Sequence, residues 1–104
     1  MKKRLFFLSL FILLSFNTFA DVEEYFRPQI DGIRLDWCLS YGSDCGEPVA
    51  YKWCIDHGYS RPLLWKIEKD VGRQEPTSTL NSRESCFKDG CDGFYTIICY
   101  RTSD

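Results

Sequence analysis

The nine residues CFKDGCDGF, from Cys86 to Phe94, contain two cysteines, two Asp-Gly pairs and two phenylalanines. They allow three interpretations: a cation loop, a catalytic corner or a turn closed by a disulfide. A calcium loop needs at least six converging oxygen ligands, whereas this stretch offers two carboxylates, Asp89 and Asp92, without EF-hand spacing. The two Asp-Gly pairs suit tight turns instead, because glycine accepts a positive φ. The stretch therefore predicts a disulfide-closed turn, with Phe87 and Phe94 anchored in the core, and no metal site is expected.

His57 is the only histidine of the chain and so the natural candidate for a general base near neutral pH. A base needs a nucleophile or a carboxylate beside it, and Asp56 points to a different face of the predicted helix. No triad or metal-binding motif accompanies the histidine. We interpret His57 as a capping or partly buried residue, and a chemical role for it stays open.

Paired carboxylates are a second possible source of catalysis, since glycosidases use two of them. The glutamates lie mostly in polar segments, where a solvated surface explains them: Glu23, Glu24, Glu47, Glu68, Glu75 and Glu84. No catalytic residue and no cofactor are therefore assigned. A small hydrolase remains the weakest of the functional alternatives.

Aromatic residues are more informative, because all three tryptophans and all six tyrosines follow residue 20. Trp37, Trp65 and Phe94 are expected in the core. Tyr41, Tyr51, Tyr59 and Tyr100 fall near loops or on outward faces and are the predicted binding residues. Exposed aromatic patches are typical of contacts with proteins or glycans, because they bring large rigid surfaces.

Residues 1–20 have the pattern of a secretory signal peptide. A basic start, Lys2 to Arg4, precedes an apolar run from Leu5 to Phe16, and small residues end the segment at Ala20. The run is too short for a membrane span, and no later segment is long and apolar enough. We expect an exported protein, secreted or periplasmic, that begins at Asp21.

Removal of this segment leaves 10 Lys and Arg against 15 Asp and Glu, a formal net charge of −5 in 84 residues. An acidic domain repels phosphate backbones, so nucleic acid and anionic membranes are not expected as partners. A protein or a glycan outside the cytoplasm is the expected partner. The oligomeric state stays open.

Six cysteines follow residue 20, and an even number in an exported chain of this size predicts three disulfides. Zinc is the alternative, but there is no C-x-x-C pair and only one histidine. Small exported domains depend on such cross-links because their cores are small. Sequence alone leaves 15 pairings open.

The pattern of apolar residues divides the chain into a polar N-terminal arm, 21–32, and a cysteine-rich domain, 33–104. Alternation predicts a strand over 33–40 with Ile33, Leu35, Trp37 and Leu39 inward. Pro48 opens a helix that ends near His57, followed by Gly58. The predicted inward stripe of that helix consists of Val49, Ala50, Trp53, Cys54 and His57.

Three further strands are expected: 63–68 with Leu63, Trp65 and Ile67 inward, a weak edge strand over 77–85, and a strand over 94–101. The last has two apolar faces, which is typical of a central strand. The sequence thus predicts a small disulfide-rich α+β domain, one short helix packed on an antiparallel sheet of about four strands.

This layout favours one set of disulfides without fixing it. Cys54 on the inward stripe and Cys99 in the central strand suit a bridge between helix and sheet. Cys86 and Cys91 suit a bridge across the turn, which leaves Cys38 with Cys45. Exchange of partners among Cys38, Cys45 and Cys54 remains open.

The chain also resembles a family of short exported cysteine-rich proteins of bacteria and plants whose function is not known. The resemblance covers residues 32 to 99 and rests on these positions: GIRLDWCL at 32–39, DCG at 44–46, Pro48, Ala50, Cys54, GYSR at 58–61, CDGF at 91–94, Ile97 and Cys99. It implies that all six cysteines belong to one framework. It implies no activity, ligand or catalytic residue.

These expectations together indicate a non-catalytic binding protein outside the cytoplasm. Such a protein stays in the periplasm or is secreted further, for instance through a type II system, which carries folded proteins. Secretion towards a host would make it an accessory virulence factor. The alternative is an inhibitor of a secreted hydrolase whose disulfide-closed loop, Cys86 to Cys91, fills the cleft of its target.

Overall fold

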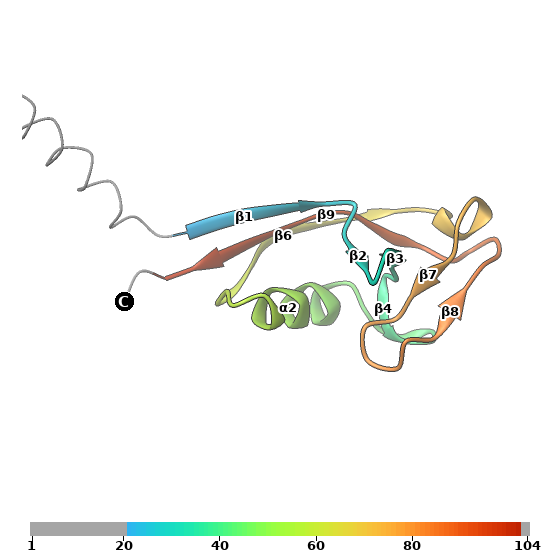
Figure 1. Ribbon diagram of the computed structural model, residues 1–104, viewed down its shortest axis with the longest axis horizontal. Coiled ribbons are helices and arrows are strands. Elements are labelled where there is room, and N and C mark those ends of the chain that lie inside the picture. Colours follow the sequence, from blue (N-terminus) through green and yellow to red (C-terminus); the bar gives the residue numbers. More distant parts are fainter. Residues whose placement is uncertain (1–20, 103–104) are drawn as a thin grey trace, which may run out of the picture.

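The computed structural model describes residues 21–102, so the expected signal peptide, residues 1–20, lies outside the described residues. The described chain is a small α+β domain with one α-helix, mostly antiparallel strands and three disulfides (Figure 1). The fold class expected from the sequence is therefore confirmed.

The main sheet has three antiparallel strands in the order β1-β9-β6: β1 (Asp21–Phe26), β9 (Gly93–Arg101) and β6 (Arg61–Glu68). Strand β9 lies in the centre, as its two apolar faces predict. Its side chains Phe94, Ile97 and Cys99 are fully buried.

Helix α2 (Glu47–Asp56) covers one face of this sheet (Figure 1). Pro48 stands in the first turn, where its missing N–H costs no hydrogen bond. The predicted inward stripe is confirmed for four of its residues, which are buried: Val49, Ala50, Trp53 and Cys54. His57, expected on the same stripe, follows the helix and is exposed.

Shorter strands form the rest of the domain. A four-stranded sheet has the order β2 (Gln29–Ile30), β3 (Ile33–Leu35), β7 (Thr77–Ser78), β8 (Ser85–Cys86), and only β3 and β7 in it are parallel. Strands β4 (Cys38–Ser40) and β5 (Ser43–Cys45) form a hairpin, and Val71–Arg73 is a 3₁₀ turn, η2. These elements lie at the end of the molecule away from the described C-terminal residues (Figure 1).

The structure differs from the sequence predictions in three strands. The predicted arm, 21–32, contains β1, which pairs with β9 along its whole length. The predicted strand 33–40 is interrupted at Asp36, whose side chain accepts a hydrogen bond from the backbone N–H of Cys38 (2.9 Å). The predicted edge strand 77–85 is two short strands, β7 and β8, joined by a turn.

The predicted inward face of β6 is wrong for two of its residues. Leu63 is 52% exposed and Ile67 is 36% exposed, and Trp65 alone packs against the core. The register between β6 and β9 shifts at Pro62/Leu64 and again at Lys66/Ile67. Each shift inserts a residue that breaks the alternation of faces.

The disulfides join Cys38 to Cys45, Cys54 to Cys99 and Cys86 to Cys91. They are the same three pairs that the layout of the sequence favours. Only Cys54–Cys99 joins segments distant in sequence, with a separation of 45 residues. It links α2 directly to the central strand.

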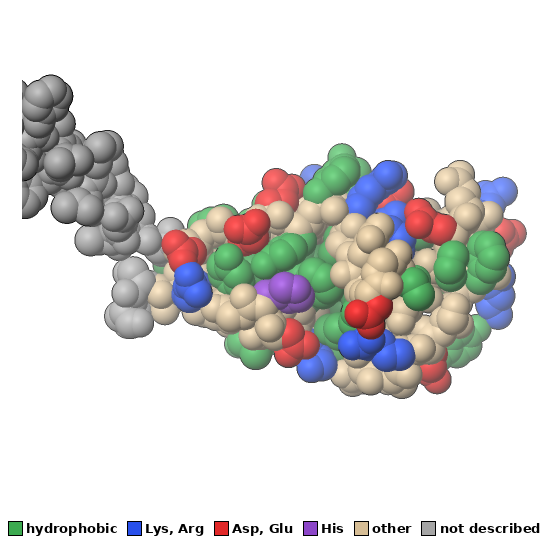
Figure 2. All heavy atoms as spheres, viewed as in Figure 1, with side chains coloured by type: hydrophobic (Ala, Val, Ile, Leu, Met, Phe, Trp, Pro, Cys, Tyr) green, Lys and Arg blue, Asp and Glu red, His purple; other side chains and the backbone are tan. Residues whose placement is uncertain are grey.

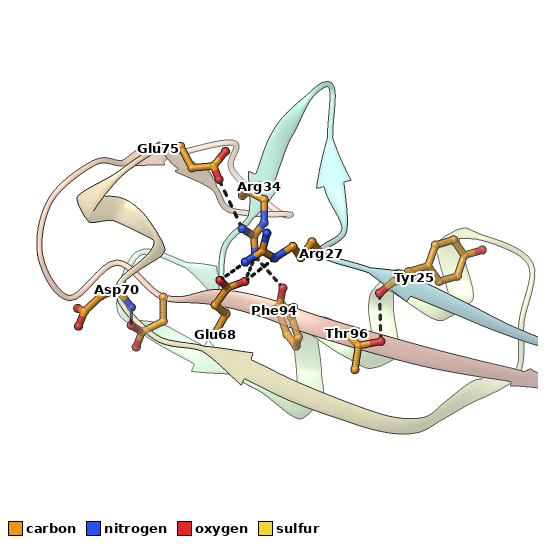
Figure 3. A network of polar contacts seen from close by, with 9 residues as sticks. Tyr25, Arg27, Arg34, Glu68, Asp70, Glu75, Phe94 and Thr96 are labelled. Atoms are coloured by element: carbon orange, nitrogen blue, oxygen red, sulfur yellow. Dashed lines mark hydrogen bonds and ion pairs between the residues drawn. The ribbon is translucent and has the colours of Figure 1, made fainter.

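A buried arginine connects the two sheets (Figure 3). Arg34 of β3 donates through Nη2 to the Glu68 carboxylate of β6 (2.7 Å) and to the carbonyl oxygen of Phe94 (2.9 Å). Arg27 donates to the other oxygen of Glu68 (2.8 Å). Partial burial raises the pKa of Glu68, but the hydrogen bonds from Arg34 and Arg27 outweigh it, so the pKa lies below its usual value.

Candidate binding site

A cleft of about 350 Å³ lies between the β4–β5 hairpin and the disulfide-closed loop from Cys86 to Cys91. Side chains of Trp37, Tyr41, Lys88 and Asp89 line it together with backbone of both loops. Two of the three disulfides are therefore at its rim.

The hairpin rim is fixed by its cross-link and its short turn. Cys38 and Cys45 face each other in the strand register and are joined by their disulfide. Ser40 pairs with Ser43, which leaves a two-residue turn, Tyr41-Gly42. Gly42 has φ 74°, a conformation that a side chain disfavours, and Tyr41 stands beside it 57% exposed.

The opposite rim is fixed by carboxylates as well as by its disulfide. The backbone N–H of Gly90 donates to Asp70 (2.9 Å), and the N–H of Asp70 donates to Asp92 (2.8 Å). Both acids thus satisfy backbone donors of turns. Asp92, considered above as a cation ligand, holds the loop in place.

Close packing under this loop depends on Gly72 of η2. A Cβ atom at Gly72 would lie 2.4 Å from the Cβ of Cys91 and 2.5 Å from the carbonyl oxygen of Lys88. The N–H of Gly72 donates to the carbonyl oxygen of Cys91 (2.9 Å). Only glycine allows η2 to approach the loop this closely.

Trp37 and Asp36 connect the two rims. The N–H of Trp37 donates to the carbonyl oxygen of Asp92 (2.9 Å), and its ring packs on Phe94 at 4.6 Å. One carboxylate oxygen of Asp36 accepts from the N–H of Cys38 and the other from the hydroxyl of Thr77 (2.5 Å). Asp36 is buried with both oxygens engaged, so it is a structural group and not a free base.

The groups left to meet a ligand are Tyr41, Lys88 and Asp89. The ammonium of Lys88 lies 5.6 Å from the Tyr41 ring centroid, and its hydrogen bond to Tyr41 raises the pKa of the lysine. Asp89 is 3.3 Å from Arg73 and largely exposed. A ring, a cation and a carboxylate around one hollow can stack on a ligand and form charge-assisted hydrogen bonds with it.

The sequence predicts part of this site. Of the four predicted binding residues, Tyr41 lies in the cleft, whereas Tyr51 is on the exposed side of α2. Tyr59 packs against the core below Arg101 (5.2 Å), and Tyr100 lies beside Arg61 on the sheet. In residues 21–102, no ring contact joins any two of these tyrosines.

Two other residues do not lie where the sequence predicts them, and one residue of the cleft was not predicted at all. Trp37, expected in the core, is half-buried and lines the cleft. Phe87, expected to anchor the loop in the core, is 65% exposed, while Phe94 is fully buried. Lys88 lines the cleft although nothing in the sequence singled it out. The short spacing of Cys86 and Cys91 predicts a closed turn, but it does not fix which side chains of the turn face the hairpin.

His57 lies on a different surface, a shallow depression between β1 and α2 (purple in Figure 2). Its ring stacks on Trp53 at 4.1 Å, and its Nδ1 lies 2.7 Å from the Trp53 carbonyl oxygen. A carbonyl oxygen only accepts, so Nδ1 carries a proton. In the described part of the chain no carboxylate is hydrogen-bonded to the ring.

Metal-binding clusters and membrane-spanning helices are both absent from residues 21–102. No cluster of three or more His, Cys, Asp or Glu side chains there has the geometry to hold a metal ion. No helix in that range is long and apolar enough to cross a membrane.

Comparison of the chain with family models, with curated proteins and with solved structures finds no match.

Proposed function

We propose that the chain is an exported, non-catalytic binding protein that recognises a glycan, or a glycan-like polar segment of a protein, through the cleft between the two disulfide-closed loops. The single observation that carries this proposal is the cleft itself. Its volume of about 350 Å³ falls within the range of small-ligand sites, roughly 300–1,000 Å³.

Rigidity supports a binding role. Each rim is cross-linked by a disulfide, and backbone hydrogen bonds to Asp36, Asp70 and Asp92 fix the loops further. A site held in one conformation loses little entropy when it binds. Free aromatic and charged groups on a fixed frame are what a recognition site requires.

The lining favours a sugar over an apolar ligand. An exposed tyrosine ring offers a stacking surface, while Lys88 and Asp89 supply a donor and an acceptor for hydroxyl groups. The carboxylates of Asp36 and Asp92 in the cleft each accept a hydrogen bond from a backbone N–H. This supports a site that binds a ligand but carries no pair of nucleophile and general base.

Export is part of the same proposal. The signal-like segment 1–20 and three disulfides support a place outside the cytosol, because thiols of cytosolic proteins stay reduced. Release by a type II system and a role as an accessory virulence factor are the further extension. Cell fractionation tests it, and recovery in the culture supernatant rather than the periplasm is the expected result.

A glycan array with the oxidised protein tests the binding proposal. We expect a ligand class whose signal is lost in Tyr41→Ala, because that ring is the exposed stacking surface of the cleft. Tyr51→Ala is the matched control, since Tyr51 is similarly exposed on α2 and lies outside the cleft. Binding that both variants retain, or the absence of any glycan ligand, would overturn the proposal.

One observation favours an inhibitor as a second candidate. Phe87 is 65% exposed and lies in the loop closed by the Cys86–Cys91 disulfide, whose two cysteines are 5 positions apart. Lys88 directly follows Phe87 in this loop. A rigid loop with a protruding ring can occupy the cleft of an enzyme. Inhibition of a secreted lysozyme or protease, lost in Phe87→Ala and retained in Tyr41→Ala, would replace glycan binding by this function.

A further inference from the structure

The main sheet has two faces, and only one of them is covered. Cys99 of β9 is joined to α2, so Cys99 and the buried Ile97 define the covered face. Side chains of a strand alternate between faces, so Thr96, Ile98 and Tyr100 lie on the other one. In the described chain no helix or strand lies over that face (Figure 1).

Strand register identifies the neighbours on the uncovered face. Residues directly opposite each other share a face. On β1 these are Val22, Glu24 and Phe26, opposite Tyr100, Ile98 and Thr96. On β6 they are Arg61, Leu64 and Lys66, opposite the same three residues of β9. We call these nine residues the outer face.

Three apolar side chains of the outer face are exposed, two on β1 and one on β6. Phe26 is 57% exposed, Val22 56% and Leu64 37%. A sheet that is apolar on an exposed face normally buries it against another layer. Such a patch indicates an interaction surface.

Charge on the outer face is divided by strand. Glu24 stands on the β1 side, and Arg61 and Lys66 stand on the β6 side. When two such faces meet about a two-fold axis parallel to the strands, β1 of each copy lies over β6 of the other. Glu24 of one copy then lies between Arg61 and Lys66 of the second copy. The face is therefore complementary to itself.

We propose that the outer face is an interface with a second copy of this chain, in a symmetric dimer that packs sheet against sheet. Strands of the two sheets would run within about 30° of each other, as in aligned sheet packing. A two-fold axis across the strands would instead place Glu24 against Glu24, and the repulsion between the two carboxylates disfavours that arrangement.

The size of the face sets the strength of the dimer. Three strands at about 4.8 Å spacing and six residues at about 3.3 Å rise give a footprint of about 14 × 20 Å. Stable interfaces bury about 800 Å² on each partner, more than this footprint supplies. We therefore expect a weak dimer, with a dissociation constant in the micromolar range or higher. The dimer leaves both clefts free, since the β4–β5 hairpin and the loop 86–91 lie outside the face.

Sedimentation equilibrium of the exported, oxidised protein from about 10 μM to about 1 mM covers the range in which such a dimer forms. We expect a concentration-dependent dimer. Phe26→Ser removes apolar contact and should weaken it at least about tenfold, whereas Tyr51→Ser, an exposed aromatic on the far side of α2, should not.

Charge reversal tests the orientation. Glu24→Lys alone and Lys66→Glu alone each place like charges opposite each other and should weaken self-association by about tenfold or more. An equimolar mixture of the two single variants should associate again, because both contacts between unlike variants are then attractive. The double variant should likewise associate with itself. Thermal melting of each variant checks that the monomer fold is retained.

Three results would overturn the proposal. The first is a monomer at every concentration. The second is a dimer that ignores Phe26→Ser and the charge reversals, since its interface would lie elsewhere. The third is Phe26-dependent binding to vesicles of mixed neutral and anionic lipid without self-association, which would make the outer face a membrane contact.

Discussion

Two regions of this small domain hold their shape by different means. Around α2 and the main sheet, fully buried side chains such as Leu35, Phe94 and Ile97 form a core, and one disulfide joins residues 45 positions apart. Around the cleft, the two disulfides close loops with separations of 7 and 5 residues, and Tyr41 and Phe87 stay exposed. Apolar burial stabilises the first region, whereas cross-links and carboxylate-backbone hydrogen bonds fix the second.

The contrast explains how so small a domain provides both a stable fold and a free surface. A chain of this length cannot bury aromatic residues everywhere. Cross-linked loops keep their conformation without using such side chains as a core. Tyr41, Phe87 and Lys88 therefore remain available to a ligand.

The largest expected effect is loss of the Cys54–Cys99 disulfide. In the chain-entropy account, closing 45 residues contributes about 4 kcal/mol to the free energy of unfolding, and closing 5 residues about 2 kcal/mol. Cys54→Ala/Cys99→Ala should thus destabilise the fold about twice as much as Cys86→Ala/Cys91→Ala. Urea unfolding under non-reducing conditions measures both, and equal losses would contradict the division into two regions.

Sequence reasoning succeeded where one local pattern decides the structure. Pro48 and the spacing of Val49, Ala50, Trp53 and Cys54 identify α2, and the two apolar faces of 94–101 identify the central strand. The sequence predictions were wrong where contacts between distant segments determine the strands. β1 has no apolar alternation because neither of its faces is deeply buried, and the register shifts in β6 that expose Leu63 have no mark in the sequence.

The site shows the same limit. The sequence indicates that Cys86 to Phe94 is a closed turn, since cysteine spacing and Asp-Gly pairs are local signals. The pairing of that turn with the β4–β5 hairpin is a long-range contact through Trp37 and Asp92. Tyr41 was identified because it adjoins Gly42 in a predicted loop, but nothing local places Lys88 beside it.

A second prediction compares single side chains from the two regions. Leu35→Ala removes a fully buried side chain and should lower the free energy of unfolding by about 2–5 kcal/mol. Phe87→Ala removes a larger ring that is 65% exposed and should change it by less than about 0.5 kcal/mol. Urea unfolding measures both variants. A large decrease in the free energy of unfolding of Phe87→Ala would show that the Phe87 ring is buried and would contradict the comparison.

A loss of stability smaller than that in Leu35→Ala is expected at the junction of the two sheets. The pKa of Glu68 is lower in the folded protein than in the unfolded chain, so its contribution is present above the unfolded pKa of about 4.3 and is lost as the pH falls through the folded pKa. Glu68→Gln weakens charge-assisted hydrogen bonds and should cost about 1–3 kcal/mol at pH 7.

Thermal or urea unfolding of the wild type and Glu68→Gln between pH 7 and pH 3 measures this dependence. The difference in stability between them should shrink toward acid pH. A difference that stays constant over that range would show that the Glu68 charge does not stabilise the junction.

Disulfide mapping by mass spectrometry, on protein isolated from outside the cytoplasm without reduction, tests the central claim most directly. The account predicts three cross-linked peptide pairs, Cys38–Cys45, Cys54–Cys99 and Cys86–Cys91, and no free thiol. Free thiols at the cleft, or a bridge that connects Cys38 or Cys45 to Cys54, would contradict it.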